Sequence, residues 1–144
     1  NHNLNNSSTY TVFVPNNNYF DDFSYFLSEI DFATAREIVL YHVLKNTYDY
    51  EFFLGNSYRL QTISTNPMNQ KVNVYSKKIL RENTDSSIEY VENICLSNGR
   101  SIKHKKYSKH HMINEVMVIG EVEKTATNGK IYVINGLLKP PCCN

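Results

Sequence analysis

The residues most able to support chemistry in this 144-residue chain are its five histidines and three cysteines. A zinc site needs several such side chains at a spacing that lets them converge on one ion. His110 and His111 are adjacent, and adjacent side chains on a strand point to opposite faces of the sheet. Cys95 and His104 match no standard ligand spacing. We therefore predict no metal site and no cofactor.

The local motifs of common enzymes are also missing from the sequence. The chain has no Gly-x-Ser-x-Gly elbow, no phosphate-binding loop, no His-Glu-x-x-His pair and no dinucleotide fingerprint. A dispersed Ser-His-Asp triad leaves no local signature, and nothing in this sequence recommends one. We expect a protein that is not an enzyme and has no catalytic residues.

The clearest charge asymmetry lies in residues 100–113, RSIKHKKYSKHHMI, which contain no acidic residue. The cations of this basic run are Arg100, Lys103, Lys105, Lys106 and Lys109. Such a cluster attracts polyanions, for example sulfated polysaccharide or acidic lipid headgroups. The competing interpretation is a solvated hairpin whose lysines discourage edge-to-edge strand pairing. A nucleic-acid partner is not expected, because the net charge is only +1 and one tyrosine among lysines makes no stacking platform.

Tyr41 and His42 lie near the end of AREIVLYHVL, a stretch with helical periodicity. His42 shares a stripe with Ile38 and Val39, so we expect it to be buried and hydrogen-bonded to a neighbouring strand. Tyr41 lies about 100° around the helix from His42. We expect its ring to be partly exposed and available for contact with a partner protein.

Two helices are predicted in the first third of the chain. The apolar residues of the segment 16–32 recur at helical spacing. A second helix is expected to begin at Thr34, because Thr34 and Glu37 form a capping-box pattern.

Beyond Tyr48 the apolar residues alternate, as they do in strands. The predicted strands in this region are residues 58–64, 71–78, 88–96, 100–107, 114–123 and 130–138. One further strand, residues 9–15, is predicted before the helices. Asn98-Gly99 and Asn128-Gly129 are strong hairpin signals, because both turn residues tolerate positive φ. A strand, then helices, then antiparallel strands predict an α+β fold in a single domain.

The three cysteines leave an odd thiol after any one disulfide. Cys95 could pair with Cys142 or Cys143 in an oxidising compartment, or all three could be reduced. Asn5 and Asn6 each begin an N-glycosylation sequon. No signal-peptide pattern and no run of 18 apolar residues is present, so no transmembrane segment is predicted.

Three segments resemble the signatures of one family in the expected order. TVFVPNNNYF (11–20) and ATNGKIYVINGLLKP (126–140) resemble the two conserved boxes of fasciclin-type (FAS1) domains, and LYHVL (40–44) resembles their Tyr-His motif. The resemblance implies an α+β fold, a FAS1-type wedge of seven strands with helices packed at one side. It also implies that the closing strand KIYVING pairs beside the strand of the first box.

Members of this family are usually extracellular, within larger adhesion or matrix proteins. The resemblance therefore implies a non-catalytic adhesion module, secreted or displayed at the cell surface, that binds a cell-surface or matrix protein. Tyr41 and His42 would be its binding candidates. Polyanion binding through the hairpin 100–111 and a purely architectural spacer role are the alternatives.

Several departures from the family pattern leave the ligand open. Tyr132 stands where the family usually has His, and Asn135 stands where it has Asp. Glu123-Lys124 replaces the Asp-Ile pair that is tied to integrin recognition in animal matrix members. Only ten residues precede Thr11, so residues 1–144 are expected to form one domain without the usual N-terminal helices, as a fragment of a larger protein.

Overall fold

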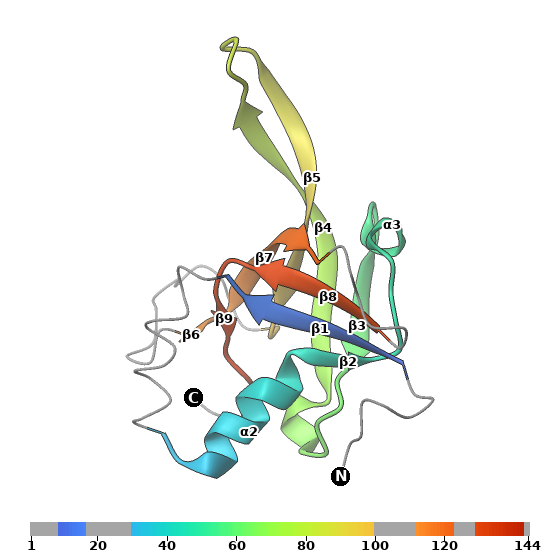
Figure 1. The fold of residues 1–144 in the computed structure, drawn as a ribbon, viewed down its shortest axis with the longest axis vertical. Helices are drawn as coiled ribbons and strands as arrows, with labels where there is room; N and C mark the ends of the chain where they lie inside the picture. The colour runs from blue at the N-terminus through green and yellow to red at the C-terminus, as the bar shows by residue number, and fades with distance from the viewer. Residues whose placement is uncertain (1–8, 17–29, 100–111, 123–128, 143–144) are drawn as a thin grey trace.

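The computed structural model describes residues 9–16, 30–99, 112–122 and 129–142 (Figure 1). These residues form a seven-stranded sheet in the order β2-β1-β8-β7-β5-β4-β3. Its strands are β1 (Tyr10–Pro15), β2 (Val43–Lys45), β3 (Ser57–Gln61), β4 (Lys71–Glu82), β5 (Ile88–Ser97), β7 (Glu115–Glu121) and β8 (Gly129–Ile134). The other elements are α2 (Phe32–Tyr41), α3 (Tyr50–Phe53), the 3-10 turn η1 (Pro67–Asn69), and the paired short strands β6 (Met112–Ile113) and β9 (Leu137–Leu138). The predicted α+β, seven-stranded fold is confirmed.

The strands of this sheet that come first and last in the sequence, β1 and β8, lie side by side in it. β1 and β8 run parallel, with Tyr10 opposite Gly129 and Pro15 opposite Ile134. The side chains of Phe13 and Tyr132 stack beneath them, with ring centroids 5.8 Å apart. The prediction that the closing strand pairs beside the opening strand is confirmed, and the apolar end of the chain closes the core.

The two outer strands of the sheet approach each other, so the sheet is nearly a barrel. Leu44 of β2 forms an isolated bridge with Thr62, just after β3. The amide of Ile63 donates to the carbonyl oxygen of Val43 at 3.0 Å. The enclosed core contains buried side chains from six of the seven strands and from both helices, and the partly buried Tyr58 and Leu60 of β3 pack against it. β2 is only three residues long, but its contacts with the segment after β3 close the sheet around this core.

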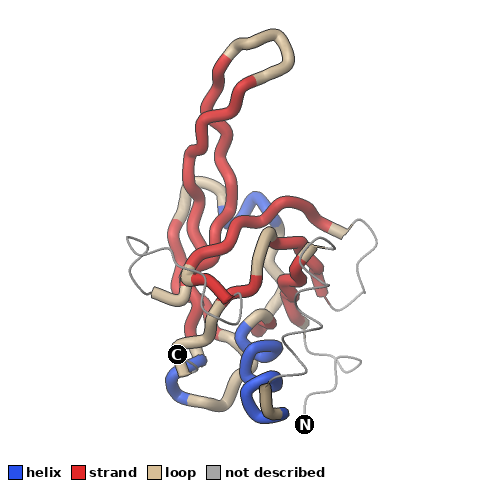
Figure 2. The backbone as a smooth tube through the Cα atoms, turned by 90° about the vertical axis from the view of Figure 1, so that its left-hand side faces the viewer, coloured by secondary structure: helices blue, strands red, loops and turns tan. Residues whose placement is uncertain are grey.

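The β4–β5 hairpin extends well beyond the body of the protein (Figures 1 and 2). The two strands pair from Asn73 opposite Ser97 to Glu82 opposite Ile88. In the described part of the chain, β3 pairs with β4 only as far as Tyr75, and β7 pairs with β5 only through the last three residues of β5. The outer half of the hairpin is therefore a two-stranded ribbon. Strands 71–78 and 88–96 were the sequence expectation, and the observed β4 is longer.

Helix α2 begins earlier than the sequence pattern indicated. Asp31 is its N-cap, and the Asp31 side chain accepts a hydrogen bond from the amide of Thr34 at 2.8 Å. The predicted capping box of Thr34 with Glu37 is therefore wrong. In the capping box the carboxylate of Glu37 would have accepted a hydrogen bond from the amide of Thr34. Asp31 accepts from this amide instead, and the helix is one turn longer at its N-terminus than predicted.

Other predicted elements are modified or lie outside the described residues. The expected strand 130–138 is two strands, because the chain leaves the sheet at Asn135 and Gly136 between β8 and β9. β7 and β8 are antiparallel neighbours as expected, with Gly129 as the first residue of β8. Most of the expected helix 16–32 and all of the expected strand 100–107 fall on residues that the structure does not describe.

Candidate functional site

The Tyr-His motif lies where α2 meets the sheet. His42 is the C-cap of α2, and its side chain is only 4% exposed. Its Nδ1 lies 2.6 Å from the carbonyl oxygen of Ile38 in the same helix. Its Nε2 accepts a hydrogen bond from the amide of Leu138 in β9 at 2.9 Å. Its backbone carbonyl accepts a hydrogen bond from the amide of Phe13 in β1. One residue thus joins α2 to β1 and to β9.

These contacts fix the protonation state of His42. The amide of Leu138 can only donate, so Nε2 must be the unprotonated nitrogen and Nδ1 must carry the proton that is donated to Ile38. Burial lowers the pKa of His42 to about 4, because a charged imidazole would lose its solvation there. The prediction of a buried histidine that is hydrogen-bonded to a neighbouring strand is confirmed.

Tyr41 is a buried residue, and its expected partial exposure is wrong. Its side chain is 0% exposed, and its hydroxyl donates to the carbonyl oxygen of Lys71 at 2.9 Å. Desolvation raises the pKa of this phenol above its usual value. Tyr41 and His42 point to different segments of the protein, as their positions around the helix indicated, but the expected exposure of Tyr41 did not follow. The expectation failed because Tyr41 packs into the main hydrophobic core, and its hydroxyl bonds to Lys71, the first residue of β4.

A second set of hydrogen bonds ties α2 to the loop between β3 and β4. The carboxylate oxygen Oε1 of Glu37 accepts hydrogen bonds from Ser64 Oγ at 2.6 Å and from Asn69 Nδ2 at 2.8 Å. The side-chain oxygen of Asn69 in turn accepts from the amide of Cys142 at 3.0 Å. Sequence reasoning had assigned Glu37 to a helix cap and missed this role. α2 is therefore anchored at its middle and at its C-terminal end.

The outer face of α2 is open to solvent and carries two large apolar side chains. Phe32 is 83% exposed and Val39 is 54% exposed. Arg36 lies between them at helical spacing and is also exposed. Val39 had been expected on the buried stripe, and that expectation is wrong. The buried positions of α2 are Ile38 and Tyr41, which turn Val39 outward.

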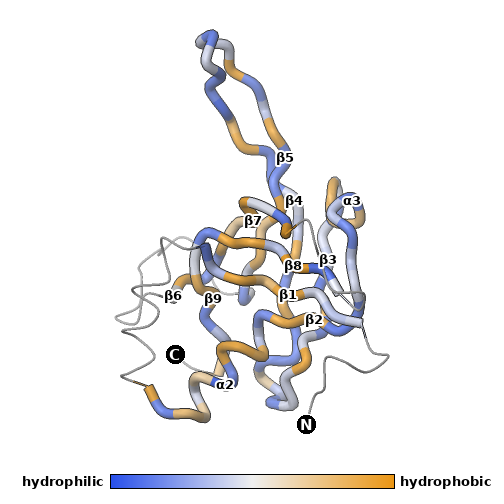
Figure 3. Tube along the Cα trace, in the orientation of Figure 1, coloured by the Kyte–Doolittle hydropathy of each residue, from blue (hydrophilic) through white to orange (hydrophobic). Residues whose placement is uncertain are grey.

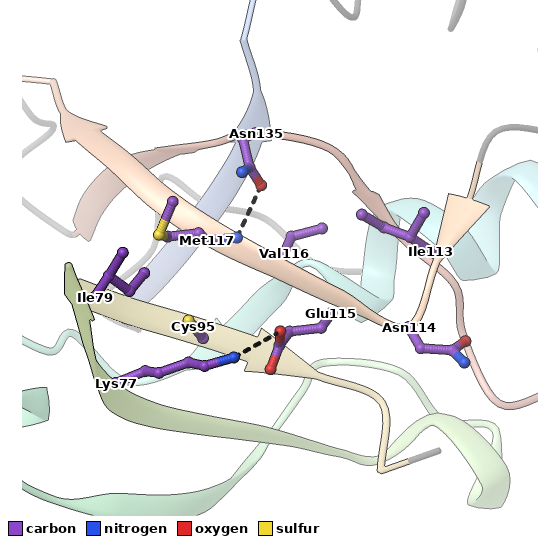
Figure 4. Close-up of a pocket in the computed structure, with 9 residues that line it drawn as sticks. All are labelled: Lys77, Ile79, Cys95, Ile113, Asn114, Glu115, Val116, Met117 and Asn135. Carbon is purple, nitrogen blue, oxygen red and sulfur yellow. Dashed lines mark hydrogen bonds and ion pairs between the residues drawn. The ribbon is translucent and has the colours of Figure 1, made fainter. Parts of the chain in front are cut away.

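A hollow of about 420 Å³ lies on the outer side of the sheet, between β7 and the base of the hairpin (Figure 4). Lys77 Nζ and Glu115 Oε1 are 3.6 Å apart across it. The hydroxyl of Tyr75 also donates to Glu115, and burial raises the pKa of that carboxyl group. Asn135 Oδ1 accepts from the amide of Met117 at 2.9 Å. The lining is mixed, and the polar groups named here are engaged with the protein.

Comparison with known proteins shows the family of this chain. The family model of the Fasciclin domain matches residues 1–140. The chain belongs to the fasciclin domain family. No curated protein matches this chain.

The fasciclin fold is also found among solved structures. This domain is similar to a FAS1 domain pair from the insect cell adhesion molecule Fasciclin I, with a TM-score of 0.56 and 16% sequence identity. The similarity covers 90% of this chain and 36% of that one, so the chain spans about a third of the length of the domain pair. At this identity the likeness concerns the fold.

Two departures from the family pattern have structural roles in this fasciclin domain. Tyr132 is 0% exposed, and its hydroxyl donates to the carbonyl oxygen of Tyr48 at 2.6 Å. The amide of Asn135 donates to the carbonyl oxygen of Met117 at 3.0 Å, while its side chain accepts from the amide of the same residue. Both residues join neighbouring segments. Glu123-Lys124 lies outside the described residues.

Of the two alternatives for the cysteines, a disulfide of Cys95 with Cys142 or Cys143 is not formed in the structure, where Cys95 is in no disulfide. The alternative of three reduced thiols does not hold either, because Cys142 is disulfide-bonded. Cys95 lies opposite Tyr75 in the β4–β5 ladder, whereas the amide of Cys142 is bonded to Asn69, which precedes β4. Several residues of extended chain, each spanning about 3.3 Å, separate those two points. A disulfide requires Cα atoms within about 7 Å.

The remaining candidates lie outside the described residues: the basic run Arg100, Lys103, Lys105, Lys106 and Lys109, the sequons at Asn5 and Asn6, and Cys143. Within the described ranges, no group of three or more His, Cys, Asp or Glu side chains could hold a metal ion. Among the described helices, none has the length and apolar character needed to cross a membrane.

Proposed function

We propose that this fasciclin domain is a non-catalytic adhesion module that acts outside the cell by binding a cell-surface or matrix protein. The observation that carries the proposal is the open apolar face of α2, which is formed by Phe32 and Val39 beside the family's Tyr-His motif. Family membership supports the adhesion role. Tyr41 and His42 contribute by holding the helix, and the partner contacts its outer face.

The anchoring of α2 suits this task. Glu37, Tyr41 and His42 each bond to a different segment of the body, so the outer face is held in one orientation before a partner arrives. A preorganised surface loses less conformational entropy on binding. Aromatic and arginine side chains are enriched at protein interfaces, and Phe32 with exposed Arg36 supplies both. This geometry supports a contact with another protein.

The test is attachment of cells to surfaces coated with the purified domain. We expect cells to attach to the parent domain, and attachment to fall to the uncoated background for the double variant Phe32→Ser/Val39→Ser. The matched control is Ile119→Ser, which removes an apolar side chain that is 48% exposed on β7. Circular dichroism must show that all three proteins are folded.

The opposite results are equally informative. Equal attachment by the parent and the double variant would remove the α2 face from the interface. Absence of attachment to the folded parent, over a range of cell types, would contradict the adhesion role and favour an architectural spacer.

A second candidate function is the capture of polyanions. Arg59 and Lys71 line a hollow of about 390 Å³ together with Asn98 and Gly99, directly before the basic run begins at residue 100. Arg59 and Lys71 therefore place positive charge beside Gly99, the residue that precedes the basic run in the sequence. Sulfated polysaccharide is the ligand class that such a surface attracts.

Heparin affinity chromatography tests this second function. We expect the parent to be retained and to elute earlier as salt rises, because screening weakens exposed charge pairs. Arg59→Glu/Lys71→Glu should reduce the eluting salt concentration, and neutralising Lys103, Lys105, Lys106 and Lys109 should reduce it further. The parent passing through at ordinary ionic strength would contradict polyanion binding.

A further inference from the structure

Hydrophobic residues occur along both strands of the projecting β4–β5 hairpin (Figure 3), and several of them are exposed. Side chains alternate along a strand, so residues two, four or six positions apart share a face. Val74 of β4 faces the core and is fully buried. Six residues further, on the same face, Leu80 is 55% exposed. Its ladder partner Tyr90 is 73% exposed, and Ile88 next to it is 62% exposed. The core-facing side of the ribbon therefore continues past the core without a cover.

Charged residues lie on this face on both sides of Leu80. Lys78 lies two residues before Leu80 on β4, and Glu82 lies two residues after it, all on one face. The ladder partners of these residues share the face, so from base to tip its rows are Lys78 with Glu92, Leu80 with Tyr90, and Glu82 with Ile88. A second copy in the reverse direction would place Glu82 over Lys78 and Lys78 over Glu82, with the rows of Leu80 and Tyr90 in contact. It would also place the aliphatic stem of Glu92 over Ile88.

The edges of the hairpin do not favour symmetric pairing. The outer half of β4 carries three cations, Lys77, Lys78 and Arg81, against the single anion Glu82, whereas the outer half of β5 carries Glu89 and Glu92. Two β4 edges, or two β5 edges, would bring like charges together, and such cross-strand pairs are destabilising. Charged side chains on an edge are a common protection against strand addition. The apolar face is the surface left for association.

We propose that the hairpin packs face to face and antiparallel on the same hairpin of a second copy of this chain, around a two-fold axis at the row of Leu80 and Tyr90. The interface is isologous, so each contact occurs twice. A parallel arrangement would make the two bodies collide, because each body lies on the apolar side at the base of its own hairpin. The antiparallel arrangement places each body near the tip of the other hairpin.

The size of the apolar patch indicates a weak dimer. One aromatic and two aliphatic side chains, each more than half exposed, offer roughly 400 Å² per copy, since a large side chain can bury about 150–250 Å². With the stems of Lys78, Glu82 and Glu92 the total buried area would be on the order of 1,000 Å², at the low end for specific interfaces. Association is therefore expected at high local concentration. The proposal is independent of the α2 surface.

Sedimentation equilibrium over a protein concentration series tests the dimer. We expect a parent dimer with a dissociation constant of roughly 10 μM to 1 mM, and a dissociation constant at least about tenfold larger for Leu80→Ser/Tyr90→Ser. Val39→Ser is the matched control, because Val39 is 54% exposed and lies on α2. It should associate as the parent does. A parent that stays monomeric throughout, or a double variant that associates equally, would overturn the proposal.

A charge exchange tests the antiparallel register. Lys78→Glu and Glu82→Lys should each weaken self-association, because each variant places like charges together twice. An equimolar mixture of the two variants should form a heterodimer as tight as the parent dimer, since every facing pair is again of opposite sign. Both positions are on the exposed ribbon, and circular dichroism confirms folding. A mixture that associates no better than the separate variants would contradict this register.

Discussion

At the scale of single residues, the Tyr-His motif acts as a structural clamp. His42 uses one ring nitrogen as a donor within α2 and the other as an acceptor from β9. Protonation would convert that acceptor into a donor that faces the amide of Leu138. The sequence predicted this burial, because a histidine on an apolar stripe needs internal partners. It did not predict the burial of Tyr41, because the core residues around Tyr41 and its partner Lys71 come from elements that are distant in sequence.

His42 should make the stability of the domain depend on pH. The unfolded chain takes up a proton on this residue near pH 6.5, whereas the folded protein does so only near pH 4. Its contribution is therefore fully present above pH 6.5 and is lost as the pH falls towards 4. The loss amounts to about 3 kcal/mol. Urea unfolding at several pH values measures it.

The control for this prediction is His42→Gln, which does not titrate. We expect the variant to be less stable at neutral pH and to lose about 3 kcal/mol less than the parent between pH 7 and pH 4. Identical pH profiles for the two proteins would show that His42 does not carry this dependence.

Tyr132 allows a test of a single buried hydroxyl. Tyr132→Phe keeps the ring among its core neighbours but removes the hydrogen bond to the carbonyl oxygen of Tyr48. We expect a loss of about 1 kcal/mol in the free energy of unfolding. Tyr90→Phe, at a site that is 73% exposed, should change it by less than about 0.5 kcal/mol. Equal effects at the two sites would argue against a buried bond at Tyr132.

At the scale of elements, the β1–β8 pair is the closure on which the fold depends. Gly129 allows it, because a Cβ atom at this position would lie 2.7 Å from the carbonyl oxygen of Tyr10. That oxygen belongs to the backbone, so the strands would have to separate to make room. The Asn-Gly pair in the sequence indicated a turn here. The structure shows that this glycine permits a close strand approach.

Gly129→Ala should therefore destabilise the domain by roughly 1–3 kcal/mol. Gly120→Ala in β7 is the matched control, because its Cβ would meet its nearest neighbour, Val133, at an ordinary 4.0 Å. We expect little change there. Thermal and urea unfolding compare the two variants, and a Gly129→Ala protein as stable as the parent would contradict the close approach.

The elements themselves were predictable to different extents. β1 and β5 follow from alternating apolar residues, and the pairing of β1 with β8 follows from the family resemblance. β2 is too short to give a periodic pattern. The projection of the hairpin was not predictable, because Leu80 and Tyr90 continue the same alternation that marks a core-facing strand. Periodicity identifies a face of a strand but does not show where the body of the protein ends.

At the scale of the whole molecule, the two proposed binding surfaces, on α2 and on the β4–β5 hairpin, are separate from the Tyr-His motif, which stabilises the fold. Exposed apolar side chains lie on α2 and on the outer half of the β4–β5 hairpin. In Figure 1 these two elements lie at opposite ends of the protein. The two faces belong to different elements, so variants of each serve as controls for the other. A fasciclin domain of this form could contact a partner through α2 while a second copy occupies the hairpin.

The most direct test of this account compares cell attachment to the parent, to Tyr41→Phe, and to Phe32→Ser/Val39→Ser, at equal amounts of folded protein. Tyr41→Phe loses only the hydrogen bond to the carbonyl oxygen of Lys71 and keeps the buried ring. We predict attachment equal to the parent for Tyr41→Phe and attachment at background for the α2 double variant. Loss of attachment by folded Tyr41→Phe, with the double variant unaffected, would contradict the account.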